Sequence, residues 1–154
     1  MTKTTTPTRY DLHNSIGYQT TLFSRISERR FDSVLAPLGL TRVSWCILLA
    51  VGQEGLKGPS DIADFIGIDR TATSRGLRRL ESTGLITRSD GKTDKRTTEV
   101  WITDKGLDHL AQATKAAAEN AAHFNEKLSW YERDMLATII RKLMQNETRD
   151  VSGL

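Results

Sequence analysis

The chain has 154 residues, near the usual size of one compact domain, and its 38% hydrophobic and 27% charged residues exclude bulk disorder. Its single cysteine, Cys46, excludes an intramolecular disulfide framework and fits a reducing cytosol. No stretch approaches the ~18 apolar residues that span a bilayer, and the N-terminus lacks the apolar segment of a signal peptide, so we expect a cytoplasmic protein with no membrane partner.

The N-terminal third of the sequence is predicted to form an arm and two helices. Residues 1–10 are Thr-rich, which favours an extended N-terminal arm. Over residues 11–36 apolar side chains recur at helical spacing, and Pro37 and Gly39 end this long helix. Thr41 is a good N-cap for a second, apolar helix that stops at the glycines between 52 and 58.

Two short helices joined by a tight turn follow, which is the helix-turn-helix pattern. Pro59 suits the first position of one helix, and Gly67 closes it. Asp69 can cap the next helix, which ends before Gly84. The residues expected to face inward are Ile62, Ala63, Phe65 and Ile66 in the first helix and Thr73, Gly76, Leu77 and Leu80 in the second.

A hairpin and two further helices complete the predicted elements. Leu85 and Ile86 begin one strand, residues 90–94 form a polar loop, and residues 97–102 form the second strand. Thr103 caps a helix that continues to about residue 128, and Ser129 with Glu132 forms a capping box for the last helix. The predicted fold class is therefore mainly α with a small β-hairpin wing, a winged helix-turn-helix lobe (41–102) flanked by long helices (11–36 and 104–145) in one unit spanning 1–154.

The basic residues are concentrated in this predicted lobe. Residues 70–98 hold eight basic and three acidic side chains, a local charge of +5, whereas the whole chain carries only +3. A chain polarised in this way presents a local cationic surface, typical of nucleic-acid binding. The simpler interpretation is a solvated helix face.

The second helix of the pair is the candidate DNA-reading element. Because its inner positions are apolar or small, its outer face carries short hydroxyls and arginines, which can contact base edges and phosphates in the major groove. An ordinary amphipathic surface helix is the alternative. The DNA-binding candidates in this helix are Arg70, Thr71, Ser74, Arg75 and Arg78.

The tip of the hairpin carries three more candidates for DNA binding: Lys92, Lys95 and Arg96. A narrow minor groove attracts such cations, and Asp94 is spaced to pair with Arg96 and orient its guanidinium. A solvated loop would have the same composition, so the DNA-binding interpretation of the hairpin tip depends on the candidate helix that precedes it.

The order and spacing of four segments resemble the MarR family of bacterial transcriptional regulators over roughly residues 11–145. The segments are LGLTRVSWCILLAV, PSDIADFIGIDRTATSRGLRRLESTGLITR, DKR and ITDKG. The resemblance implies a recognition helix with the residues named above, a wing arginine at Arg96 partnered by Asp94, and a homodimer formed by the terminal helices. Thr73 and Gly76 depart from the usual aliphatic residues, so helix packing is expected to be closer or looser than usual.

The resemblance also implies a small aromatic or anionic effector bound between the terminal helices and the lobe. The residues that could contribute to such a pocket are His13, Tyr18, Arg25, Arg42 and Trp45, although the aromatic ones are more often plain core and the arginines surface. Cys46 lies in an apolar run that makes its thiol inert. We find no metal-ligand spacing, cofactor motif or catalytic signature, and we expect no metal, no cofactor and no enzyme activity.

The function predicted from the sequence is a sequence-specific regulator of transcription. The expected partners are double-stranded DNA with a palindromic operator, a second copy of the chain, and a small-molecule effector that releases a repressor. The alternative function is a winged-helix module for protein interaction or nonspecific, architectural DNA binding without a ligand response.

Overall fold

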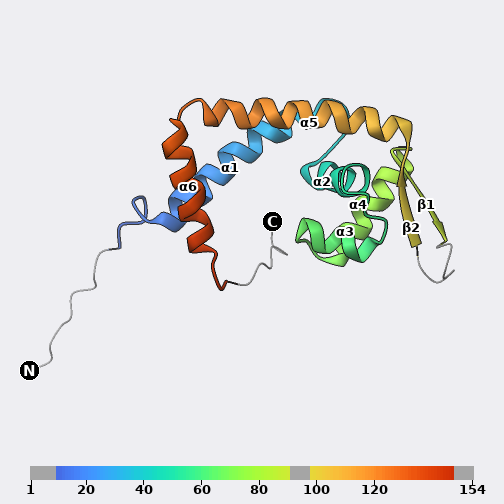
Figure 1. Cartoon of the computed structure of the whole chain (residues 1–154), viewed down its shortest axis with the longest axis horizontal. Helices are drawn as coiled ribbons and strands as arrows, with labels where there is room; N and C mark the ends of the chain where they lie inside the picture. The colour runs from blue at the N-terminus through green and yellow to red at the C-terminus, as the bar shows by residue number, and fades with distance from the viewer. Residues whose placement is uncertain (1–9, 91–97, 148–154) are drawn as a thin grey trace, which may run out of the picture.

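The computed structural model describes residues 10–90 and 98–147. Within these residues it is mainly helical, with one two-stranded antiparallel sheet (Figure 1). The elements in chain order are α1 (Ile16–Leu35), η1 (Ala36–Leu38), α2 (Arg42–Gly52), α3 (Pro59–Ile66), α4 (Arg70–Ser82), β1 (Ile86–Asp90), β2 (Thr98–Ile102), α5 (Asp104–Asn125) and α6 (Trp130–Leu143). The predicted fold class is confirmed.

Four predicted helix starts are confirmed by the capping geometry, at Thr41, Asp69, Thr103 and Ser129. In each case a side-chain oxygen accepts a hydrogen bond from a backbone N–H of the first turn that lacks a helical partner. At Ser129 the capping box is complete, since Glu132 also accepts from the Ser129 backbone N–H at 2.8 Å.

The first helix is shorter than predicted at its N-terminal end. It starts at Ile16 instead of residue 11, with Ser15 as its N-cap. Asn14 Nδ2 donates to Asp11 Oδ2 at 2.7 Å, and such local side-chain bonds favour a turn over a helix. Its other end passes into η1, which closes at Gly39 with φ of 67°.

One inward-facing prediction is wrong. Phe65 is 52% exposed, whereas Ile62 and Ala63 are buried and Ile66 packs against the core. At roughly 100° per residue, the buried face is centred between positions 62, 63 and 66, and position 65 lies about 110° away from that centre. The apolar character of Phe65 therefore does not mark the inner face.

The hydrophobic core lies in the winged helix-turn-helix lobe and continues into the ends of α1 and α5 next to it. The side chains that are fully buried there include Leu35, Ile47, Leu48, Ile62, Leu77, Leu80, Ile86 and Val100. By contrast, α1 buries only Phe31 and Leu35, and every residue of α6 is exposed. The lobe thus has a well-buried hydrophobic core, while the terminal helices leave apolar side chains exposed in the single chain.

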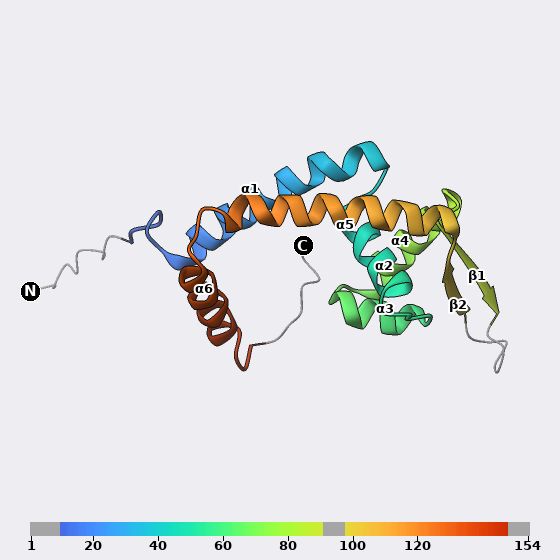
Figure 2. The same cartoon turned by 45° about the horizontal axis from the view of Figure 1, so that its top comes forward.

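The long helix α5 connects the two ends of the molecule. It begins beside β2, runs alongside α1 and leads to α6, which turns away near the N-terminal end of α1 (Figures 1 and 2). No single helix in residues 10–90 and 98–147 is long and apolar enough to cross a membrane. Only α1 with η1 and α2, taken together across a bend of 71°, reaches that length and composition.

Candidate nucleic-acid interface

Helix α4 is anchored through its inner face. The Asp69 carboxylate accepts from the Ala72 N–H at 2.8 Å, and the buried Thr73 hydroxyl donates to the Asp69 carbonyl at 3.0 Å. Leu77 and Leu80 are 1% exposed. With these positions fixed inward, the opposite face must point away from the lobe.

The structure places the predicted DNA-reading residues of α4 on that outer face. Arg70, Thr71, Arg75 and Arg78 are exposed, and Ser74 is half-buried. Arg78 Nη2 donates to Ser74 Oγ at 3.1 Å, which holds the guanidinium along the helix. Arg75 makes no hydrogen bond or ion pair with any residue that the structure describes, so its five N–H donors are available to a ligand.

The packing of α4 explains the unusual glycine at position 76. A Cβ built on Gly76 would lie 2.5 Å from Ile47 Cδ1 and 3.5 Å from Val43 Cγ1, both on α2. These distances show a close approach of α4 to α2 at this position. Helix α4 sits against α2 at a distance that a larger inner side chain would disturb.

The wing is a regular hairpin at its base. β1 and β2 pair antiparallel, with Ile86 opposite Ile102 and Arg88 opposite Val100. The predicted tip residues Lys92, Asp94, Lys95 and Arg96 lie outside the described residues.

An ion pair joins the end of α4 to the wing. Arg88 Nε donates to Glu81 Oε2 at 2.9 Å, and Arg88 Nη2 donates to the same oxygen. The hydrogen bonds from Arg88 hold the pKa of the Glu81 carboxyl below its usual range, and Glu81 in turn raises the pKa of Arg88.

A hollow of about 240 Å³ lies between α3, α4 and the wing, and we call it the α4–wing hollow. It brings together two predicted DNA-binding residues, Arg70 and Ser74, with Ser60 and Arg88, which the sequence reasoning did not single out. Arg88 lies in the basic segment 70–98. Its charge is opposite to that of Glu81, and this was the feature of the sequence that could have predicted their ion pair. The residues lining this hollow are Pro59, Ser60, Arg70, Ser74, Leu77, Arg88 and Thr98.

The turn after α4 is fastened to the first turn of α5. The Thr103 hydroxyl donates to the Gly84 carbonyl at 2.7 Å, and Lys105 Nζ donates to the Thr83 carbonyl at 2.8 Å. A Cβ on Gly106 would overlap the Leu85 carbonyl oxygen. The ITDKG segment therefore acts as the joint between the lobe and the long helix.

The five residues predicted for a ligand pocket do not line one hollow within the single chain. Tyr18 and Arg25 line a hollow of about 480 Å³ along α1, and His13 stacks edge-on against Tyr18 at 4.9 Å between ring centroids. Arg42 instead pairs with Glu28 at 2.6 Å and with an aspartate of α1. Trp45 packs edge-on against a phenylalanine of α1, and its Nε1 is buried without a hydrogen-bond partner in the described part of the chain.

Other candidate chemistry is sparse in the described residues. Burial raises the pKa of the Cys46 thiol, an effect that Arg42 only partly offsets, in keeping with the inert thiol expected. Within residues 10–90 and 98–147 no group of three or more His, Cys, Asp or Glu side chains could hold a metal ion.

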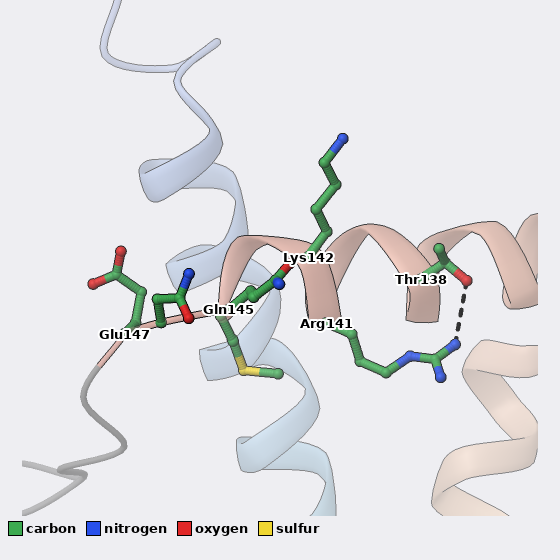
Figure 3. Close-up of a pocket in the computed structure, with 7 residues that line it drawn as sticks. Thr138, Arg141, Lys142, Gln145 and Glu147 are labelled. Atoms are coloured by element: carbon green, nitrogen blue, oxygen red, sulfur yellow. Dashed lines mark hydrogen bonds between the residues drawn. The ribbon is translucent and has the colours of Figure 1, made fainter.

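The hollow of about 650 Å³ at the end of α6 is not a convergent site. Figure 3 shows Lys142 and Arg141 pointing in different directions, with Arg141 turned back to Thr138, to which its Nη2 donates at 3.2 Å. Side chains that diverge in this way do not surround a common ligand.

Comparison with known proteins agrees with this geometry. Residues 38–97 match the family model described as MarR family. Three similar solved structures are the transcriptional repressor CouR bound to a 23-mer DNA duplex, a cysteine-to-serine mutant of MarR from E. coli complexed with operator DNA, and BpsR from Bordetella bronchiseptica, described with regulation of DNA binding by 6-hydroxynicotinic acid.

The likeness extends over almost the whole chain in each case. CouR is 26% identical with a TM-score of 0.78, over 92% of this chain and 100% of that one. The MarR mutant is 23% identical with a TM-score of 0.77, over 88% of this chain and 99% of that one. BpsR is 18% identical with a TM-score of 0.82, over 91% of this chain and 100% of that one. Over residues 38–97 the chain matches the MarR family model, and over nearly its whole length it shares the winged helix-turn-helix fold of DNA-binding regulators of transcription.

Proposed function

We propose that this regulator is a cytoplasmic homodimeric repressor that binds a palindromic operator and is released from it by a small aromatic or anionic compound. The observation that carries the DNA-reading part is the outer face of α4, where Arg75 is exposed and makes no bond to any described residue. An arginine in that state can contact guanine O6 and N7 without first breaking a bond within the protein. Thr71, Ser74 and Arg78 share this face, and the predicted wing-tip cations would extend the contact into the minor groove.

The dimer is proposed from the uncovered apolar faces of the terminal helices. Trp130 is 73% exposed and Ile16 is 64% exposed, and soluble proteins seldom leave many such side chains in one region uncovered. A groove of about 450 Å³ between α1, α5 and α6 is lined almost entirely by apolar side chains, including Phe23 and Leu136. The same helices of a second copy fit this groove, which divides the chain into dimerisation helices (11–36 and 104–145) and a DNA-binding lobe (41–102).

The ligand class is proposed from the residues on α1 and α2 together with the relatives. BpsR is described as regulated by 6-hydroxynicotinic acid, an aromatic acid. Here Tyr18 and Arg25 line one hollow, and Trp45 has an indole N–H without a partner among the described residues. An aromatic carboxylate would match the Arg25 cation and the Tyr18 ring at that hollow, whereas Trp45 lies outside it.

The test is selection of bound genomic DNA with the purified protein, followed by footprinting of the recovered site. We expect a footprint with two-fold symmetry and half-sites about one helical turn apart. A monomer that protects an asymmetric site equally well would contradict the proposal. Genes beside the recovered site would define the compounds to be tried as effectors.

The alternative, a nonspecific or protein-binding winged helix, is separated by Arg75→Ala. Base reading predicts a loss of about 1–3 kcal/mol on the selected site and little change on a scrambled duplex. The matched control is Arg29→Ala on α1, an exposed arginine away from α4 that makes no hydrogen bond or ion pair with the described residues. Equal losses on both duplexes would favour the nonspecific module.

A further inference from the structure

We propose that Glu81 is a positioning residue for DNA binding, which holds Arg88 so that Arg88 and Arg70 can bind one phosphate of the DNA backbone at the α4–wing hollow. This inference rests on the proposed operator binding and adds Glu81 and Arg88 to the residues predicted to act in it. It assigns a DNA-related role to an acidic side chain, which is the opposite of what its charge alone would predict.

The geometry of the ion pair leaves Arg88 three of its five N–H donors. A guanidinium carries five N–H groups, and two of them, on Nε and Nη2, point to Glu81 Oε2. Both Nη1 hydrogens and one on Nη2 remain, and Arg88 is one of the residues that line the hollow. The two bonds to one oxygen fix the plane of the guanidinium, so the remaining donors have a defined direction.

The composition of the hollow fits a phosphate. Arg70 makes no bond to any described residue, and the hydroxyls of Ser60 and Ser74 lie at the same hollow. Its volume of about 240 Å³ is below the roughly 300 Å³ at which small-molecule pockets begin. Its place beside the outer face of α4, between that helix and the wing, is where a DNA backbone would pass if α4 enters the major groove.

The ion pair also links the two DNA-binding elements directly. Glu81 is in the last turn of α4 and Arg88 is in the middle of β1, and their side chains are 38% and 31% exposed. An exposed ion pair adds little to stability. Its value lies in the orientation of Arg88, so its loss should be felt in DNA binding more than in unfolding.

The decisive variant is Glu81→Gln, because simple electrostatics and the positioning role predict opposite signs. Removing a negative charge from a DNA-binding lobe should tighten binding, whereas the neutral amide oxygen of glutamine would hold Arg88 less firmly than the carboxylate and should weaken binding to the selected site roughly three- to tenfold. The control is Asp64→Asn on α3, an exposed aspartate that makes no hydrogen bond or ion pair with the described residues. We expect this control to bind as tightly as the natural chain or more tightly. A Glu81→Gln protein that matches it would overturn the proposal.

The phosphate contact is tested with duplexes in which single phosphates are replaced by neutral methylphosphonates. We expect one position at which the natural protein loses affinity and Arg88→Ala loses clearly less, because only Arg70 still contacts that phosphate in the variant, and Arg88→Ala should lower the log–log salt slope by about 0.9. If the natural protein and Arg88→Ala lose the same affinity at every methylphosphonate position, the proposed contact between Arg88 and a phosphate is wrong.

Exchanging the two residues, Glu81→Arg with Arg88→Glu, separates structure from contact. The exchange restores the ion pair but moves the cation to α4, so we expect normal thermal unfolding with DNA binding still impaired. Recovery of full affinity would overturn the proposal.

Arg75→Ala on the same duplexes keeps the two proposals distinguishable. If Arg75→Ala weakens binding and Arg88→Ala does not, only the present inference fails. If the natural protein binds no selected site, both the present inference and the proposed function fail.

Discussion

Replacing Gly106 by alanine should destabilise the protein, although alanine normally favours a helix. Gly106 lies in the first turn of α5, and a Cβ at this position would overlap the Leu85 carbonyl oxygen and lie 2.7 Å from Ile102 Cγ1. Real Cβ atoms do not approach other heavy atoms closer than 3.0 Å. The neighbouring backbone would have to move away from α5, because a carbonyl group cannot rotate aside as a side-chain end can.

The magnitude follows from three terms. Overpacking costs typically about 1–3 kcal/mol, and the Leu85 carbonyl accepts the Thr103 N–H at 3.1 Å, a bond worth about 1 kcal/mol that the displacement would strain. Against these stands about 1 kcal/mol gained by replacing glycine in a helix. We expect a net loss of about 1–3 kcal/mol in the free energy of unfolding.

The assay is urea unfolding followed by circular dichroism at one fixed protein concentration, since a dimer unfolds in a concentration-dependent way. The control is Gly17→Ala in α1, where a Cβ would meet nothing within 4 Å, and which should be neutral or slightly stabilising. Gly76→Ala should fall between the two, because its close neighbour is the end of the Ile47 side chain. A Gly106→Ala protein as stable as the natural chain would refute the reasoning.

Three further predictions concern a cap, a charge and the dimer. Asp69→Ala removes the carboxylate that accepts the Ala72 N–H at 2.8 Å and should cost about 1 kcal/mol in urea unfolding, and an unchanged midpoint would contradict this. Because Arg88 lowers the pKa of Glu81, the ion pair contributes fully above the ordinary glutamate pKa of 4.5 and is lost as pH falls through the lower folded value. The Tm difference between the natural chain and Glu81→Gln, small because the pair is exposed, should therefore vanish in acid, and a difference independent of pH would count against this. Ile139→Glu, at a side chain 46% exposed on α6, should give a folded monomer in sedimentation, since the lobe buries none of α6, and a persistent dimer would exclude α6 from the interface.

The parts of the fold that the sequence predicts well are those set by local chemistry. Asp69 caps α4 because its carboxylate reaches a backbone N–H three residues ahead, and no distant residue is needed for that bond. Gly67 closes α3 with φ of 77°, a conformation that glycine adopts at no steric cost. Phe65 shows the limit of the same reasoning, since hydrophobicity alone does not say on which side of a helix a residue lies.

The parts that the sequence could not predict depend on contacts across the fold. Glu81 and Arg88 are seven residues apart, and their meeting depends on how the chain turns from α4 into β1. The need for glycine at position 106 likewise depends on the Leu85 carbonyl group, 21 positions earlier in the chain. The outer face of α4 was predictable because periodicity fixes it, whereas the hollow beside it needs three elements in place.

The joint between α4 and α5 offers a physical route from a distant ligand to the DNA. Three consecutive carbonyl groups in the turn after α4, those of Thr83, Gly84 and Leu85, are held by Lys105 and Thr103. The end of α4 and the start of α5 must therefore move together. At 1.5 Å per residue, the 22 residues of α5 extend about 33 Å, so a rotation of about 5° at the far end displaces α4 by about 3 Å. One base pair rises about 3.4 Å, so a shift of this size takes a recognition helix out of register with its half-site. In the proposed mechanism, a compound bound between the terminal helices would therefore release the operator through this joint without touching α4.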